Sequence, residues 1–235
     1  MNGRRCRWLL LHGTPLTPQV WDGIVGYLRG YGPVWRPDVT PAAGSPDAQA
    51  ALATHLASAL EPSPERLHVV GHSFGGQIAI DFALLAPQRV QALTLICTRD
   101  TPFPAFAAAA AQLRHGSPVD ITAALRRWFT APELSAGGPV VTYARRCLRQ
   151  ADRAAWAAAL DAIASYDRAN RVGAIGVPST LIAAELDHVS TPAAMSGLAD
   201  RLPRARLHVL PGAAHMTPFS DPGQLARLIS RAAPG

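Results

Sequence analysis

Short apolar runs alternate with segments of helical period along most of this 235-residue chain. Apolar runs that end in a turn or loop predict strands over residues 6–11, 34–39, 67–70, 92–97, 179–184 and 205–210. Apolar residues spaced three or four apart predict helices over residues 21–28, 48–60, 77–85, 192–202 and 222–232. Strands that alternate with helices form mostly parallel, doubly wound sheets, so the pattern predicts an α/β core.

The alternation stops between residues 101 and 176. This segment is rich in Ala, Arg and Trp, and its helical stretches are broken at residues 116–118 and 136–139. Ligands of doubly wound folds bind at the carboxyl ends of the strands, so we expect a helical lid inserted above those ends. The predicted organisation is a core of residues 1–100 and 177–235 and a lid of residues 101–176.

One serine stands in a motif with a clear structural meaning. Residues 71–76 read Gly-His-Ser-Phe-Gly-Gly, directly after a predicted strand and before a predicted helix. G-x-S-x-G in this context is the nucleophile elbow. Glycine tolerates positive φ and close backbone approach because it has no Cβ. We therefore expect Ser73 Oγ to be exposed at the carboxyl end of the sheet and the amino end of a helix.

A nucleophilic serine needs an imidazole to accept its proton and a carboxylate to orient that imidazole. Of eight histidines, only His215 follows the last predicted strand, and Asp187 follows the strand before it. Ser73, Asp187 and His215 therefore form the predicted triad. Two alternatives for the acid stay open. One is Asp100, which follows the strand after the elbow, and the other is Asp161.

With these motifs the chain resembles the α/β-hydrolase fold superfamily nearly from end to end. His-Gly at residues 12–13 is similar to the family's oxyanion turn, and residues 71–76 to its elbow. Residues 187–192 and 211–215 are similar to its acid and histidine loops. Within the superfamily, Arg-Trp-Phe-Thr at residues 127–130 resembles the lid of the 3-oxoadipate enol-lactonase group.

Three features depart from the family's usual pattern. The hairpin that usually precedes the His-Gly strand has almost no residues here, so we expect about six strands. The family's Asp-x-x-Gly-x-Gly-x-Ser loop appears at residues 38–45 as Asp-Val-Thr-Pro-Ala-Ala-Gly-Ser. The glutamate often found five residues after the histidine is Ser220, which we interpret as a helix cap.

The same loops predict the oxyanion hole, which needs two N–H donors aimed at the developing alkoxide. The backbone N–H of Phe74, next after the nucleophile, is the first expected donor. The second is the N–H of Thr14, which follows the His-Gly pair, because Pro15 has no N–H to donate.

Three residues are candidates for contact with substrate: His12, Arg127 and Trp128. For each there is a simpler interpretation. His12, like His72, borders the site, and such histidines more often hold loops by hydrogen bonds. Trp128 more often belongs to the core of the lid.

The predicted lid carries much of the positive charge of the chain, with nine arginines against five acids. The arginines are Arg114, Arg126, Arg127, Arg145, Arg146, Arg149, Arg153, Arg168 and Arg171. The acids are Asp120, Glu133, Asp152, Asp161 and Asp167. The simpler interpretation is a solvated surface, with Asp152 close enough to pair with Arg149 and Arg153. The alternative is that Arg127 faces the pocket and holds a carboxylate of the substrate.

Composition excludes several other functions. The net charge of +6 comes from arginine alone, and no basic run is interleaved with aromatics, which argues against nucleic-acid binding. No apolar run approaches membrane-spanning length, and we expect neither signal peptide nor anchor. Cys6, Cys97 and Cys147 are scattered, as is typical of thiols in a reducing compartment, so a cytoplasmic bacterial protein is expected. No spacing indicates a metal site, and no cofactor is expected.

The sequence thus predicts a serine hydrolase that cleaves a carboxylic ester of a small metabolite, of the methyl ester or lactone type, through an acyl-enzyme. The same triad would serve a thioesterase or a hydrolase of carbon–carbon bonds. A different class of function is a non-catalytic binding protein on the same fold, because fold alone does not establish function. The expected partner is the small-molecule ester, and the expected state is a monomer or homodimer.

Overall fold

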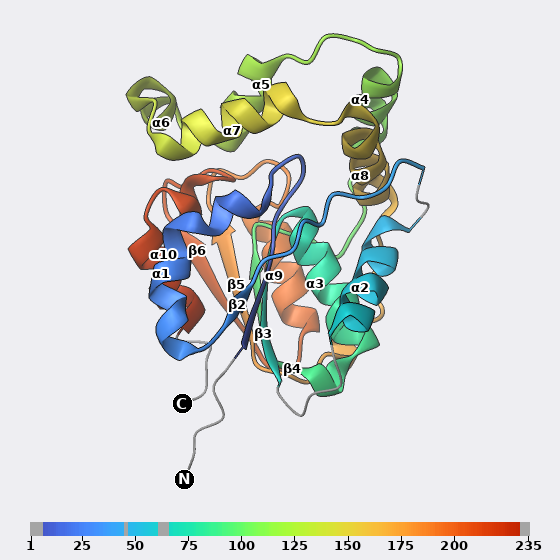
Figure 1. Ribbon diagram of the computed structural model, residues 1–235, viewed down its shortest axis with the longest axis vertical. Helices are drawn as coiled ribbons and strands as arrows, with labels where there is room; N and C mark the ends of the chain where they lie inside the picture. Colours follow the sequence, from blue (N-terminus) through green and yellow to red (C-terminus); the bar gives the residue numbers. More distant parts are fainter. Residues whose placement is uncertain (1–6, 45–46, 61–65, 231–235) are drawn as a thin grey trace.

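The computed structural model describes residues 7–44, 47–60 and 66–230, so that Cys6 lies outside the described residues. Six parallel strands form one sheet in the order β2-β1-β3-β4-β5-β6 (Figure 1). They are β1 (Arg7–Leu11), β2 (Val34–Trp35), β3 (Leu67–His72), β4 (Val90–Ile96), β5 (Ser179–Ala184) and β6 (Ala205–Leu210). The predicted fold class, a doubly wound parallel sheet of about six strands, is confirmed.

The helices fall into two groups. Those that connect or follow the strands of the sheet are α1 (Asp22–Leu28), α2 (Ala48–Ala59), α3 (Phe74–Leu85), α9 (Pro192–Arg201) and α10 (Pro222–Ser230). Those inserted between β4 and β5 are α4 (Ala105–Arg114), α5 (Ile121–Trp128), α6 (Ala131–Ala136), α7 (Pro139–Gln150) and α8 (Arg153–Ser165). Within the described residues, none of the helices has the length and apolar character needed to cross a membrane.

Alternation along the strands divides the core into two layers. In β1, Leu9 and Leu11 pack with residues of α2, α3 and α9, whereas Trp8 and Leu10 pack with residues of α1 and α10. Figure 1 shows these two groups of helices on opposite faces of the sheet. Successive side chains of a strand point to opposite faces, which explains why buried β1 has apolar residues at successive positions.

The inserted helices occupy two places. Helices α5, α6 and α7 lie across one end of the sheet, beyond the tip of the β5 arrow, while α4 and α8 lie next to each other above α2 and α3 (Figure 1). Ala110 and Leu113 of α4 and Leu160 of α8 belong to the same apolar cluster as α2 and α3. The insertion therefore shares a core with the sheet. Its division from the core at residues 101–176 stays a prediction.

Two boundaries differ from those predicted. The strand expected over residues 34–39 is only two residues long, because Pro37 cannot donate to a ladder and Asp38 accepts from the N–H of Thr40 in a turn. Helix α3 begins at Phe74 rather than at residue 77. Its first turn contains Gly75 and Gly76. Because glycine is a poor helix former, the sequence pattern indicated a helix only from residue 77.

Candidate active site

Ser73 stands in a backbone conformation that few non-glycine residues adopt. Its φ is +53° and its ψ is −119°, between the end of β3 and the start of α3. A Cβ on Gly71 would lie 2.3 Å from the carbonyl oxygen of Gly75, and one on Gly75 would lie 2.2 Å from that of Leu11. The two glycines are thus required by close packing of the backbone, and the positive φ falls on the serine itself.

Neighbouring strands hold this strained turn in place. The N–H of Ser73 donates to the carbonyl oxygen of Ile96 at 2.9 Å. The carbonyl oxygen of Ser73 accepts from Thr98 Oγ1 at 2.7 Å and from the N–H of Gly76 at 2.9 Å. Because both backbone groups of Ser73 are satisfied, the geometry of the elbow is set by β4 as well as by its own glycines.

Asp187 and His215 meet beside the carboxyl ends of β5 and β6. Nδ1 of His215 lies 2.6 Å from Oδ2 of Asp187, and both side chains are buried. The other oxygen, Oδ1, accepts from the N–H groups of Val189 at 2.8 Å and Ser190 at 3.1 Å. Burial raises the pKa of Asp187, but the charge and hydrogen bond of His215, together with these two N–H groups, outweigh burial, and the pKa falls to about 2. Asp187 is thus an ionised acceptor that fixes the imidazole ring.

The two alternative acids have other partners. Both carboxylate oxygens of buried Asp100 accept from Arg201, at 2.8 and 2.6 Å. Asp161 forms an ion pair with Arg114 on the surface of the inserted helices. Among the described residues, Asp187 is therefore the carboxylate that contacts His215.

Ser73 and His215 line the same cavity, which has a volume of about 240 Å³. Its wall is mostly apolar and comes largely from α4, α5 and α8, including Leu113, Ala124 and Leu160. Within the described part of the chain, no hydrogen bond joins Ser73 Oγ to His215, as is common before substrate binds.

The two predicted oxyanion donors lie at the ends of neighbouring strands. Thr14 follows β1 and lines the cavity, and Phe74 is the first residue of α3, where the N–H has no partner inside the helix. Within the described residues, neither N–H donates to a protein group. Both are therefore available for an oxyanion. β1 and β3 adjoin where the strand order reverses, which is where ligands bind in such sheets.

The two histidines that border the site hold loops. His12 Nε2 accepts from the N–H of Val39 at 3.0 Å and lies 3.2 Å from Asp38 Oδ1. It lines a second cavity of about 550 Å³, rather than the cavity of Ser73. Burial, and then the charge of His215, lowers the pKa of His72 well below its ordinary value, and its ring packs 4.8 Å from that of His215. His72 is thus a neutral packing partner of His215.

The predicted lid residues are only partly as expected. Arg127 is exposed, but it lines the cavity of Ser73, as does half-buried Trp128. Asp152 pairs with neither of the arginines expected, Arg149 and Arg153, among the described residues. Its carboxylate instead accepts from two N–H groups at the start of α8, so capping a helix takes precedence over pairing.

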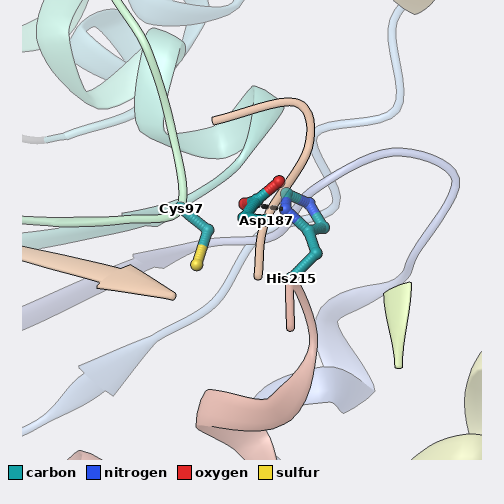
Figure 2. Close-up of side chains that lie close together, drawn as sticks. All are labelled: Cys97, Asp187 and His215. Atoms are coloured by element: carbon teal, nitrogen blue, oxygen red, sulfur yellow. Dashed lines mark hydrogen bonds and ion pairs between the residues drawn. The ribbon is translucent and has the colours of Figure 1, made fainter. Parts of the chain in front are cut away.

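Cys97, which the sequence indicated only as a thiol of a reducing compartment, lies beside the proposed acid and base. Figure 2 shows Cys97 close to Asp187 and His215. The thiol sulfur, a carboxylate oxygen and an imidazole nitrogen of these residues lie within 4.8 Å of one another. Cys97 has a φ of +45°. Burial, and then the charge of Asp187, raises the pKa of its thiol well above its ordinary value. These groups have the chemistry of a metal site, but Nδ1 of His215 is already engaged by Asp187.

Two residues whose contacts the sequence did not indicate, Glu133 and Tyr143, come from the inserted helices. Glu133 accepts from Thr217 and Ser220, which follow His215 in the connection between β6 and α10. This connection, residues 211–221, is called the histidine loop below. The hydroxyl of Tyr143 contacts Thr17. Ser220 was interpreted as a helix cap. It ends the short 3-10 helix Thr217–Phe219, where its N–H donates to the carbonyl oxygen of Thr217, whereas Asp221 caps the start of α10 by accepting from Gln224. The sequence shows the capping-box pattern at residues 130–133, which indicates the local role of Glu133. Its contacts with Thr217 and Ser220 join distant parts of the chain, so no local pattern indicates them.

Comparison with known proteins now adds to this geometry. A model described as "Alpha/beta hydrolase family" matches residues 8–228. The chain belongs to the alpha/beta hydrolase family. The predicted superfamily is confirmed, and so is the predicted class of enzyme, a carboxylic ester hydrolase.

A curated relative from Aromatoleum aromaticum, a pimeloyl-[acyl-carrier protein] methyl ester esterase, is 30% identical over 94% of this chain and 95% of its own length. A solved hydrolase from Pseudomonas aeruginosa is 26% identical, with a TM-score of 0.86, and covers 97% of this chain and 89% of that chain. An enol-lactonase from Burkholderia xenovorans has a TM-score of 0.87 at 22% identity, over 97% of this chain and 91% of that chain. At that identity the likeness concerns the fold alone.

Proposed function

We propose that this hydrolase removes the methyl group from the methyl ester of an acyl chain held on an acyl carrier protein, through an acyl-enzyme on Ser73. The substrate class is that of the Aromatoleum relative. The observation that carries the proposal is the His215–Asp187 pair, which shares with Ser73 a cavity of mostly apolar lining. At about 240 Å³ the cavity is smaller than the roughly 300–1,000 Å³ of sites for drug-sized ligands, which favours one unbranched acyl chain.

The geometry supports the following steps. Asp187 accepts a hydrogen bond from the N–H at Nδ1 of His215, which leaves Nε2 free to take the proton of Ser73 Oγ. Oγ then attacks the ester carbonyl, and the N–H groups of Thr14 and Phe74 bind the oxyanion. His215 returns the proton to the leaving methoxide, so that methanol departs. Water, activated by the same imidazole, then attacks the acyl-enzyme and releases the carboxylate and Ser73.

Such a substrate carries two bonds that a serine hydrolase can cleave, the methyl ester and the thioester to the carrier. We propose that the methyl ester reaches Ser73, because the methoxide leaving group needs no pocket of its own and the acyl chain fills the apolar cavity. A thioesterase on the same triad would instead release the carrier thiol.

The test is to incubate the protein with a methyl-esterified acyl carrier protein and to measure methanol and free thiol separately. Release of methanol without thiol, abolished in Ser73→Ala, is the expected result. Release of thiol first would favour the thioesterase. Neither product, together with no labelling of Ser73 by a fluorophosphonate, would favour a non-catalytic binding protein.

The exposed arginines of the inserted helices are the proposed contact for the carrier. Arg126, Arg145, Arg146 and Arg149 of α5 and α7 form no ion pair within the described residues. Exposed charges are screened by salt. If the carrier binds this surface through its carboxylates, KM for the carrier-linked ester should rise with ionic strength, and KM for a small methyl ester should not. Arg149→Glu should raise the first KM selectively.

A further inference from the structure

The loop that carries His215 is bonded to the inserted helices by residues that directly follow the histidine. After His215, the N–H of Met216 donates to the carbonyl oxygen of Trp128, the last residue of α5, at 2.9 Å. Before His215, the N–H of Ala214 donates to Thr217 Oγ1 at 2.8 Å, and Thr217 in turn donates to Glu133 of α6. Inserted helices therefore contact the chain directly just after the proposed base, and reach the residue before it through Thr217.

Glu133 has more partners than a helix cap requires. Its Oε2 accepts from the N–H and the hydroxyl of Thr130, at 2.8 and 2.9 Å, which completes the capping box of α6. The same oxygen also accepts from Thr217 Oγ1 at 2.9 Å, and Oε1 accepts from Ser220 Oγ at 2.9 Å. Half of the hydrogen bonds of this carboxylate therefore reach the histidine loop.

The direction of each bond follows from the count of donors. The oxygen of Thr217 accepts the N–H of Ala214, so its single hydroxyl proton is free to point at Glu133. The N–H of Thr217 donates to the carbonyl oxygen of Ala214 at 3.0 Å. Two hydrogen bonds between residues 214 and 217 thus close a turn that contains His215. The carboxylate of Glu133 fixes the hydroxyl of Thr217, which makes one of these two bonds.

We infer that Glu133 is a positioning residue for His215, acting through Thr217. The inference rests on the proposed role of His215 as the base. Asp187 fixes the ring of His215 at Nδ1, and Glu133 fixes the backbone from which the ring projects. The carboxylate comes from the inserted helices, in a chain where the position five residues after the histidine holds Ser220, whose hydroxyl now contacts Glu133.

The competing interpretation is that Glu133 serves only the capping box of α6. Two substitutions separate the two roles. Thr217→Val removes the two contacts of the hydroxyl, with the N–H of Ala214 and with Glu133, and leaves the capping box intact. Thr130→Ala removes the capping partner and leaves the contacts of Glu133 with the histidine loop. Thr217→Ser keeps the hydroxyl and serves as the conservative variant.

The measurement is kcat and KM on an aryl acetate, whose acyl group is too short to depend on the inserted helices, with urea unfolding of every variant. Glu133→Ala and Thr217→Val should lower kcat by about 10- to 100-fold with KM little changed, because misplacement of a reacting group acts on kcat. Thr217→Ser should restore most of kcat, and Thr130→Ala should lower stability but not kcat. The rate of labelling by a fluorophosphonate should follow kcat.

Unchanged kcat in folded Thr217→Val and Glu133→Ala would overturn the inference. An equal loss in Thr130→Ala would overturn it too, because the integrity of α6 alone would then matter. Failure of the proposed function has a different signature. In that case His215→Ala itself would keep the activity of the parent protein.

Discussion

The side chains of His215 and Asp187 are both buried and are joined by a hydrogen bond of 2.6 Å. A short, charge-assisted bond between buried groups is stronger than one at the surface. Asp187 also accepts from the N–H groups of Val189 and Ser190, so it cannot turn away from the imidazole without losing them. The geometry assigns Asp187 to the orientation of His215.

Asp187→Asn should therefore lower kcat by about 10⁴-fold without unfolding the protein. The amide of asparagine can donate to Nδ1, which would hold the imidazole in the wrong tautomer and take its proton-accepting nitrogen away from Ser73. The measurement is kcat on a methyl ester, with urea unfolding to confirm that the fold is kept.

Asp100→Asn is the matched control. Asp100 is equally buried, but its partner is Arg201, so its loss should reduce stability and leave kcat largely intact. If Asp100→Asn abolished turnover in a folded protein while Asp187→Asn kept it, the assignment of the acid would be reversed.

Arg127→Ala should raise KM for an ester that bears a free carboxylate, by about tenfold, the value of one modest charge-assisted hydrogen bond. Arg127 lines the cavity of Ser73 and has no ion-pair partner among the described residues. The substrates to compare are the monomethyl ester of a dicarboxylic acid and a neutral methyl ester of equal length. Arg126→Ala is the control, because Arg126 lines a different cavity. Equal effects on both substrates would make Arg127 a surface charge only.

Tyr143→Phe should lower both stability and kcat. The hydroxyl of Tyr143 accepts from the N–H of Thr17 at 3.0 Å and donates to its carbonyl oxygen at 2.9 Å, and so connects α7 to the loop that carries Thr14. Leaving these backbone groups unpaired costs about 1–3 kcal/mol and loosens the proposed oxyanion donor. Urea unfolding and kcat on a small ester test the two effects. Tyr31→Phe removes an exposed hydroxyl and should change neither.

The sheet and the candidate triad could be predicted because their signals are local. Each strand of the core is a short apolar run, and each proposed catalytic residue follows such a run within a few positions. The elbow was readable because its glycines are demanded by backbone contacts within a few residues or with the adjacent strand. Parallel strands bring their carboxyl ends to one edge, so residues distant in sequence could be placed together.

The rest could not be predicted because it depends on tertiary contacts. Cys97 adopts a positive φ beside Asp187, and both features depend on how β4 and β5 pack together rather than on a local sequence pattern. The contact of Glu133 with Thr217 joins positions 84 apart in sequence. The strand expected over residues 34–39 had a strand-like composition, but Pro37 removed a donor that the ladder needed.

His68 predicts a pH dependence of stability that is independent of catalysis. It lies in β3, 2% exposed, with its ring 4.6 Å from that of Trp8. Within the described residues, its Nε2 has no hydrogen-bond partner. Burial lowers its pKa from 6.5 to about 4. The folded protein therefore holds His68 neutral at a pH where the unfolded chain has already bound a proton.

The sign follows from this difference. The stability contributed by neutral His68 is fully present above pH 6.5 and is lost as the pH falls from 6.5 toward about 4. At pH 5 the loss for one such group is about 2 kcal/mol. Urea unfolding at pH 7.5 and pH 5 should thus show a steeper loss in the parent protein than in His68→Gln, which cannot bind this proton. Other titrating groups act on both proteins and cancel in the difference. Equal losses in both proteins would mean that His68 gains its proton in the folded state as easily as in the unfolded chain.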